Sequence, residues 1–274
     1  MTDLASRVAE HTWYHSIELP GGVTTPGFFD TITAAGRVDL PDSLAGKRCL
    51  DIGSCDGFWA FELERRGARE VEAIDLADPA ARDWPGNGRP DTEDPGRSRA
   101  TFALAAEALN SNVRRRDLSI YDVSPERLGT FDFVFIGNLL LHLRDPIGAL
   151  MAVRSVVDGE LFSVEPISVP ATLSRPRTPR AVLSTRPVPY WWTPNFAGYA
   201  EYFVKSGFAR VERGRPFFFP FGRGYYRRPP LGELARSPRQ AFFWSTTRWL
   251  GAPTAWIRAL PGQATPAGTS SSST

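Results

Sequence analysis

The sequence predicts an α/β domain in which a mainly parallel sheet is covered by helices on both faces. Short apolar runs alternate along the chain with segments whose apolar residues recur at helical spacing. The first strong apolar run ends in a loop of small and acidic residues, 50–57, directly before such a helical segment. The chain has 274 residues, which is long enough for one such domain with additional segments and a sizeable core.

The expected elements follow one another in a regular order. Strands are expected at 47–53, at 71–76, within 113–123, at 131–136 and from 160 onward. Helices are expected at 58–66, 98–110 and 146–156, and Gly67 is a good C-cap for the first. A loop rich in Pro, Gly, Asp and Arg is expected at 77–98. Strands that alternate with helices in this way favour parallel pairing.

Further segments surround this core, which we place at 47–168. Residues 1–46 should form a short helix and an extended segment that together make an N-terminal cap, because aromatic side chains beside a Pro-Gly-Gly turn are unusual in a disordered tail. Residues 169–193 are rich in Pro and Arg and are expected to be a lid insertion. Residues 194–261, with a helix at 195–206 and a strand at 209–213, should complete the sheet and form the acceptor region, and 262–274 should be a disordered tail.

Composition narrows the possible functions. There are 32 basic and 30 acidic residues, a balance that does not favour nucleic acid as a partner. The two cysteines, Cys49 and Cys55, cannot build a zinc site or a disulfide framework, and no metal site is expected. No signal segment or membrane span is evident, so we expect a cytoplasmic protein. The oligomeric state stays open.

The loop after the first strand is the strongest functional signal. Small residues between a buried strand and a helix let a ligand approach the backbone closely. Asp75 lies at the end of the next strand, twenty-two residues after Gly53, where a carboxylate can accept hydrogen bonds from both hydroxyls of a ribose. A dinucleotide-dependent oxidoreductase is disfavoured, because Cys55 stands where G-x-G-x-x-G requires its second glycine.

These motifs resemble those of the class I S-adenosylmethionine-dependent methyltransferases. The resemblance covers about residues 46–168 and rests on Asp51-Ile52-Gly53, Gly57, Asp75 and the strand 131–135 (FDFVF), in the family's order. It implies a Rossmann-like methyltransferase fold with S-adenosyl-L-methionine as the cofactor. By position, the resemblance implies which residues contact each part of the cofactor. The methionine part would be bordered by Asp51, Gly53 and Gly57, with Ser54 and Cys55 between them, and the ribose would be held by Asp75 and Leu76. The adenine would be flanked by Leu118, Ser119 and Ile120, and the residues beside the sulfonium would be Gly137, Asn138 and Leu139.

A narrower resemblance is carried by two further stretches. Residues 137–146 (GNLLLHLRDP) and Trp13-Tyr14-His15 are similar to the CmoB-like branch, the tRNA wobble-uridine carboxymethyltransferases. Those enzymes have a larger N-terminal region than this chain. They also use basic residues to hold a carboxylated cofactor and RNA, and these basic residues have no clear match here. This resemblance therefore supports the fold more than the substrate.

Candidate acceptor residues lie near the expected methyl group. His142 follows the fourth strand and is a candidate general base for a hydroxyl acceptor, although it can equally be a histidine that hydrogen-bonds the backbone. Glu165 follows the fifth strand at the edge where α/β sheets bind ligands. The remaining candidates are aromatic or near aromatics and can line an acceptor pocket or simply pack: Trp13, Tyr14, His15, Tyr190, Trp191 and Trp192.

The sequence thus predicts a methyltransferase that methylates a hydroxyl of a small molecule, a sugar or secondary metabolite, by in-line transfer. One alternative is a tRNA wobble-uridine (carboxy)methyltransferase, which predicts a basic surface and RNA binding that depends steeply on salt. A second is a non-catalytic, partner-binding protein of the same fold, which predicts a damaged cofactor pocket.

Overall fold

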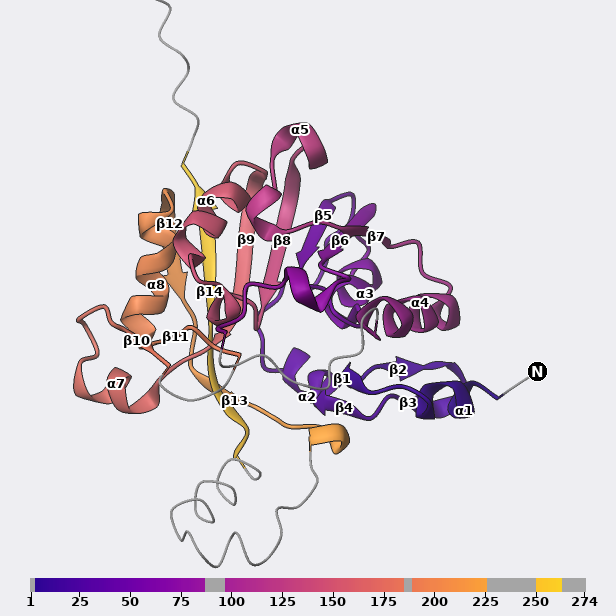
Figure 1. The fold of residues 1–274 in the computed structure, drawn as a ribbon. Coiled ribbons are helices and arrows are strands. Elements are labelled where there is room, and N and C mark those ends of the chain that lie inside the picture. The colour runs from indigo at the N-terminus through magenta and orange to yellow at the C-terminus, as the bar shows by residue number, and fades with distance from the viewer. Residues whose placement is uncertain (1–2, 87–96, 185–188, 226–249, 263–274) are drawn as a thin grey trace, which may run out of the picture.

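The computed structural model describes residues 3–86, 97–184, 189–225 and 250–262. A single large sheet crosses the molecule, with helices on its two faces and the N-terminal segment packed below α3 and α4 in the view of Figure 1. Residues 263–274, nearly all of the expected tail, lie outside the described residues. None of the helices in these ranges is long and apolar enough to span a lipid bilayer.

Among the described residues the sheet has eight strands, and it is mainly parallel, as the sequence predicts. Its order is β12 (Phe208–Arg213), β14 (Ala252–Pro261), β9 (Val157–Pro166), β8 (Phe131–Gly137), β5 (Arg48–Ile52), β6 (Glu70–Asp75) and β7 (Arg114–Asp117), and β13 (Phe217–Phe219) also pairs with β14. The five strands from β9 to β7 are parallel, whereas β12, β13 and β14 pair antiparallel. The strand β14, which inserts between β9 and β12, was not expected from the sequence.

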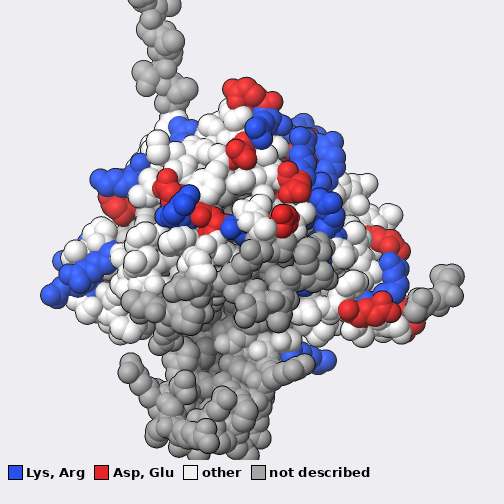
Figure 2. Space-filling view, viewed as in Figure 1, with Lys and Arg blue, Asp and Glu red and all other residues white. Residues whose placement is uncertain are grey.

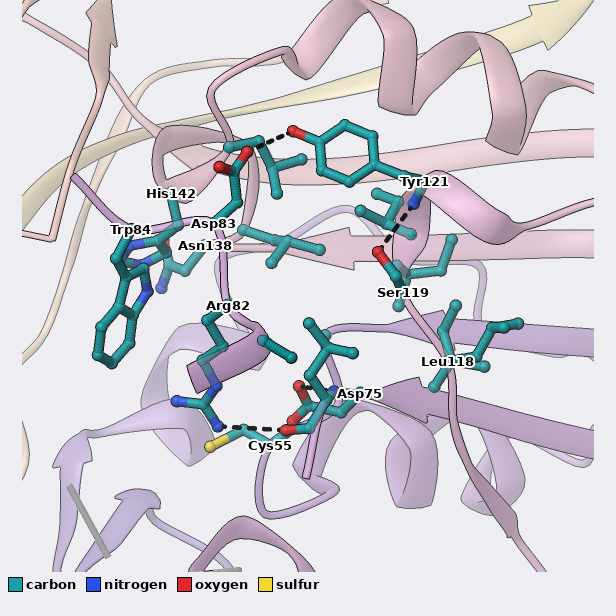
Figure 3. A pocket seen from close by; sticks show the side chains of 18 of the residues that line it. Cys55, Asp75, Arg82, Asp83, Trp84, Leu118, Ser119, Tyr121, Asn138 and His142 are labelled. Carbon is teal, nitrogen blue, oxygen red and sulfur yellow. Dashed lines mark hydrogen bonds between the residues drawn. The ribbon is translucent and has the colours of Figure 1, made fainter. Parts of the chain in front are cut away.

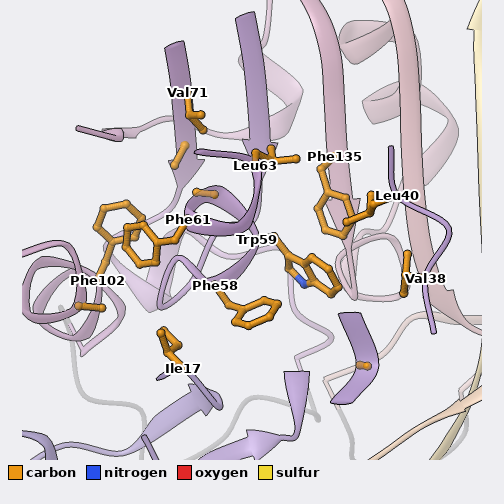
Figure 4. Packing of buried hydrophobic residues seen from close by; sticks show 14 of the residues in the cluster. Ile17, Val38, Leu40, Phe58, Trp59, Phe61, Leu63, Val71, Phe102 and Phe135 are labelled. Atoms are coloured by element: carbon orange, nitrogen blue, oxygen red, sulfur yellow. The ribbon is translucent and has the colours of Figure 1, made fainter. Parts of the chain in front are cut away.

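Helices cover both faces because successive side chains of a strand point to opposite sides. Cys49 packs on the face of α3 (Phe58–Arg65) and α4 (Arg97–Leu109), whereas Leu50 packs on the face of α5 (Pro125–Leu128), α6 (Pro146–Arg154) and α8 (Phe196–Lys205). Figure 4 shows the first of these cores, in which aromatic side chains of α3 meet those of α4 and β8. Both helical layers position the carboxyl ends of the parallel strands.

The N-terminal segment forms a small unit that is anchored on the core by one carboxylate. It contains α1 (Leu4–Ala9), β1 (Trp13–His15), β2 (Glu18–Leu19), η1 (Pro20–Gly22), β3 (Val23–Thr24), β4 (Gly27–Phe29) and α2 (Thr31–Ala35). The fully buried Asp56 accepts hydrogen bonds from the backbone N–H groups of Tyr14 (2.5 Å) and His15 (2.9 Å) and from the hydroxyl of Thr101 (2.6 Å). It therefore links β1 to the loop after β5 and to α4.

The expected insertion at 169–193 contains α7 (Val169–Ser174) and β10 (Ala181–Leu183), and β10 pairs antiparallel with β11 (Trp192–Pro194). Asn195 organises this segment. Its fully buried amide accepts from the N–H groups of Arg180 and Gly198 and donates to two carbonyl groups, those of Arg175 and Thr178. The short 3-10 turns η2 (Pro79–Ala81), η3 (Ile120–Asp122), η4 (Leu140–His142) and η5 (Arg223–Tyr225) complete the described elements.

Candidate functional site

A cavity of about 250 Å³ opens at the carboxyl ends of β5, β6 and β8, the edge where α/β sheets bind ligands. Figure 3 shows Asp75 and Cys55 on one wall, Leu118 and Ser119 on another, and Asn138 and His142 on a third. Ten of the thirteen residues expected to contact the cofactor line it: Gly53, Cys55, Asp75, Leu76, Leu118, Ser119, Ile120, Gly137, Asn138 and Leu139. The other three, Asp51, Ser54 and Gly57, are not on its wall.

The loop after β5 takes its shape from left-handed backbone conformations. Gly57 has a φ of 92°, and a Cβ atom there would lie 2.7 Å from ring carbons of Phe61 and Phe102. Cys55 adopts a φ of 47°, the left-handed region that glycine enters most readily. The loop thus bends left-handed at Cys55 although no glycine stands there.

Asp75 presents a carboxylate at the cavity wall. Its oxygens accept from the N–H groups of Cys55 (2.9 Å) and Leu76 (2.7 Å), and the Arg115 guanidinium lies 3.6 Å away. Burial raises the pKa of Asp75 from its ordinary value, against the opposing effect of Arg82 and Arg115. Burial, with a contribution from Asp75, raises the pKa of Asp51 to about 8. Ionisation of both carboxyl groups is therefore disfavoured at this end of the site by their burial and by their closeness to each other.

His142 lines the cavity and has a defined tautomer. Its Nδ1 is hydrogen-bonded to the carbonyl oxygen of Pro189, and a carbonyl only accepts, so Nδ1 carries the proton and Nε2 the lone pair. Burial lowers the pKa of His142 to about 4, which keeps the ring neutral at pH 7. The Tyr190 ring lies 5.4 Å from the imidazole, centroid to centroid.

The N-terminal candidates separate into two groups. Tyr14 lines the cavity together with Asn138, and burial holds the pKa of Tyr14 well above its usual range. Trp13 and His15 are buried and do not line the cavity; the Trp13 indole donates to the Val8 carbonyl at 2.9 Å. Burial lowers the pKa of His15 to about 4. The structure thus brings only Tyr14 of this trio to the cavity wall.

The candidates from the later part of the chain are not on the cavity wall: Glu165, Tyr190, Trp191 and Trp192. The Trp191 indole donates to the Asp83 carbonyl (2.5 Å), and the Trp192 indole donates to the Arg144 carbonyl (3.0 Å). Glu165 is buried behind the turn after β8, where it accepts from backbone N–H groups. A direct contact of Glu165 with an acceptor in the cavity is therefore not supported by its position.

Sequence reasoning missed a strap formed by residues 77–86, which crosses from β6 toward the turn after β8. Arg82, Asp83 and Trp84 of this strap line the cavity. The Asp83 carboxylate accepts from the Tyr121 hydroxyl (2.7 Å) and from the N–H of Arg144 (2.8 Å). The sequence showed only a polar, Pro-rich loop, because the partners of Asp83 are distant along the chain.

The chain is similar to curated methyltransferases over part of its length. It is 28% identical over 166 residues to the ubiquinone biosynthesis O-methyltransferase of Neisseria meningitidis serogroup C, covering 57% of this chain and 58% of that protein. It is 29% identical over 118 residues to the magnesium-protoporphyrin O-methyltransferase of Rhodobacter capsulatus, covering 43% of each. The matches thus span about half of these relatives or less. No family profile matches the chain.

Solved structures confirm the fold. The YcgJ protein of Bacillus subtilis superposes with a TM-score of 0.54 at 13% identity, covering 86% of this chain and all of that one. The N-terminal domain of EvdMO1, determined in the presence of S-adenosylhomocysteine (SAH) and D-fucose, gives 0.54 at 14% identity, covering 94% and 95%. The chain therefore has the predicted Rossmann-like methyltransferase fold.

Proposed function

We propose that this chain, which has the methyltransferase fold and is similar in sequence to O-methyltransferases, transfers a methyl group from S-adenosylmethionine to a hydroxyl of a small molecule. The observation that carries the proposal is one cavity that combines a ribose-type carboxylate, Asp75, with a neutral histidine whose Nε2 is unprotonated, His142. The first group suits the cofactor and the second suits proton removal from the acceptor.

The residues present fit the cofactor. Asp51 is fully buried, and its Oδ2 has no hydrogen-bond partner among the residues that the structure describes. With Asp75 beside it, this end of the site favours a ligand that carries positive charge and hydroxyl groups. Asp75 and Leu76 would hold the ribose, the loop from Gly53 to Gly57 the amino-acid part, and Leu118 to Ile120 the adenine. When bound, S-adenosylmethionine supplies an electrophilic methyl group.

His142 is suited to accept the proton of a hydroxyl acceptor. The hydrogen bond from Nδ1 to Pro189 fixes the ring and leaves Nε2 as the basic atom. Its pKa of about 4 makes it a weak base. A weak base suffices here, because a hydroxyl becomes strongly acidic as its oxygen forms a bond to a methyl carbon.

The described surroundings of His142 favour an uncharged acceptor with a ring. Tyr14, Trp84 and Asn138 share the cavity with His142, and Tyr190 packs against the imidazole. Aromatic faces stack on sugar and phenol rings, while the phenol and amide groups can hydrogen-bond their hydroxyls. We therefore assign the acceptor to ring-bearing alcohols such as sugars or aromatic secondary metabolites.

Calorimetry with S-adenosylmethionine, SAH and NAD tests the cofactor. We expect both adenosyl ligands to bind and NAD not to bind. An acceptor screen that begins with sugars and phenols then tests the reaction. If neither adenosyl ligand binds, the proposal fails, and the partner-binding alternative and the carboxylated cofactor of the tRNA-modifying branch become the next hypotheses; RNA binding that falls steeply with salt would support the latter.

Replacing His142 by alanine should lower kcat by about 100-fold or more if His142 is the general base, because proton removal then depends on water. His11→Ala is a matched control, since His11 does not line the cavity. Near-normal turnover of folded His142→Ala protein, with unchanged SAH affinity, would remove His142 from the mechanism.

A further inference from the structure

Glu165 lies directly behind the turn that carries two proposed functional groups. It is near the carboxyl end of β9 and is 2% exposed. Its Oε1 accepts from the N–H of Leu139 (2.8 Å) and from the N–H of Leu140 (2.9 Å). These residues lie between Asn138, which has a left-handed φ of 52°, and His142. One carboxyl oxygen thus holds the backbone of the turn that presents both side chains to the cavity.

The second oxygen of Glu165 has a different environment. Oε2 is buried and has no hydrogen-bond partner within the described ranges, and the same is true of the Tyr202 hydroxyl. Glu165 and Tyr202 border one small cavity of about 10 Å³, near the lower limit for a single water. The Tyr202 hydroxyl carries a proton, yet no hydrogen bond joins it to Oε2, so an ionised Oε2 would be a buried charge without a donor among the described residues, whereas a protonated Oε2 can itself donate to the Tyr202 oxygen or to a shared water.

No cation balances this carboxyl group in the part of the chain that the structure describes. Its titratable neighbours are tyrosines, namely Tyr14 on β1 and Tyr199 and Tyr202 on α8. The Tyr199 hydroxyl is already hydrogen-bonded to Ser163 (2.8 Å), and none of the ion pairs among the described residues includes Glu165. An ionised Glu165 would be a buried charge stabilised only by backbone N–H groups.

We propose that Glu165 is a positioning residue that works as a neutral carboxylic acid: Oε1 fixes the turn 138–142 through two backbone N–H groups, and Oε2 keeps a proton that faces the cavity shared with Tyr202. That the turn matters for methyl transfer rests on the proposed function. The protonation of Glu165 and its hydrogen bonds to the turn are independent of that function. Burial, which raises the pKa of Glu165 to about 8, agrees with the geometry.

The chain allows a direct test with Glu165→Gln and Glu165→Ala. Glutamine reproduces the neutral acid, since its carbonyl oxygen accepts the two N–H groups and its NH₂ replaces the proton on Oε2. Alanine removes both interactions. In the full-length protein, amide exchange at Leu139 and Leu140 should rise by about tenfold or more in Glu165→Ala and stay within about threefold of the wild type in Glu165→Gln.

Carbon-13 NMR of the carboxyl groups supplies the second readout. The Glu165 signal should report a protonated group at pH 6 and ionise only near pH 8, and Tyr202→Phe should shift that titration. Titration of Glu165 near pH 4 to 5 would overturn the proposal. So would loss of amide protection in Glu165→Gln as large as in Glu165→Ala, because the ionised form would then be required.

Activity tests whether the turn matters for the reaction. We expect Glu165→Ala to lower kcat by about tenfold or more, and Glu165→Gln to restore it and to remove the decline of kcat near pH 8. If Glu165→Ala does not fold, the titration and Glu165→Gln still decide the proposal. If the protein has no methyltransferase activity, the exchange and NMR results still stand, so the two failures can be told apart.

Discussion

Two of the three carboxylates on strand β6, Glu72 and Asp75, have opposite environments. Glu72, at the middle of the strand, is fully buried and surrounded by guanidinium groups of Arg48 (2.7 Å), Arg116 (2.9 Å) and Arg114 (3.3 Å). Asp75, at its carboxyl end, has the Arg115 guanidinium 3.6 Å away, lies within the electrostatic influence of Arg82 and shares its surroundings with the buried Asp51. Figure 2 shows Lys and Arg side chains gathered over β7, with acidic side chains among them.

This difference separates a carboxylate that is paired within the protein, Glu72, from one that is placed to contact a ligand, Asp75. Around Glu72 the chain supplies its own cations, so no external ion is needed and the cluster serves stability. Around Asp75 and Asp51 the described residues would balance a second carboxylate charge only in part, and burial raises the pKa values of both groups. A carboxyl group with a perturbed pKa on a cavity wall, as Asp75 is, is typical of functional sites.

The largest effect on stability should come from Glu72→Gln. Removing this carboxylate leaves three guanidinium groups without their shared partner, and we expect a loss of about 2–3 kcal/mol in the free energy of unfolding, because the arginines are partly exposed. Urea denaturation measures it. Glu107→Gln, which breaks the exposed pair with Arg7, is the control and should leave the denaturation midpoint unchanged. Equal effects of the two variants would contradict a structural role for the Glu72 cluster.

Asp75→Ala should affect binding rather than folding. We expect SAH affinity to fall by about 1–3 kcal/mol, the loss of hydrogen bonds to a charged group. Calorimetry measures this, and the exposed Asp158 at the opposite end of the sheet provides the control Asp158→Ala. Unchanged affinity would remove Asp75 from the ribose role.

Asp51→Asn should have the smallest effect on stability at pH 7, within about 1 kcal/mol, because asparagine resembles the protonated acid. The pKa of Asp51 is raised from 3.8 to about 8 in the folded protein, so its contribution to stability should decline as the pH rises from about 4 to 8. Denaturation of the ligand-free protein across this range should show a flatter pH dependence for Asp51→Asn. The same slope in both proteins would show that Asp51 is ionised throughout.

Much of the sheet follows from local patterns. The helix expected at 58–66 is α3 at 58–65, and the strand expected at 131–136 is β8 at 131–137, because apolar periodicity and glycine ends act locally. The strand β14 was missed. It has prolines near both ends and few polar residues to give an alternating pattern, and it exists because β9 and β12 pair with its two edges.

The residues of the site can likewise be divided into those that local sequence predicts and those that it does not. The loop after β5 and the acid at the end of β6 could be predicted, since both depend on residues close together in sequence. The role of Asp56 in holding Tyr14 and the strap pinned by Asp83 could not, because their hydrogen bonds join residues 38 to 61 positions apart. His142 lines the cavity on the turn after β8, and only the Pro189 carbonyl, 47 positions away, defines its tautomer.

The sequence by itself determined the α/β architecture and the position of the small-residue loop after β5, because periodicity and glycine geometry are properties of short segments. Only the tertiary structure decided what each carboxyl group does. Glu72 and Asp75 lie three residues apart on one strand, yet one is enclosed by arginines and the other is left facing a cavity. The physical reason is that charge state depends on burial and on neighbours brought from distant parts of the chain.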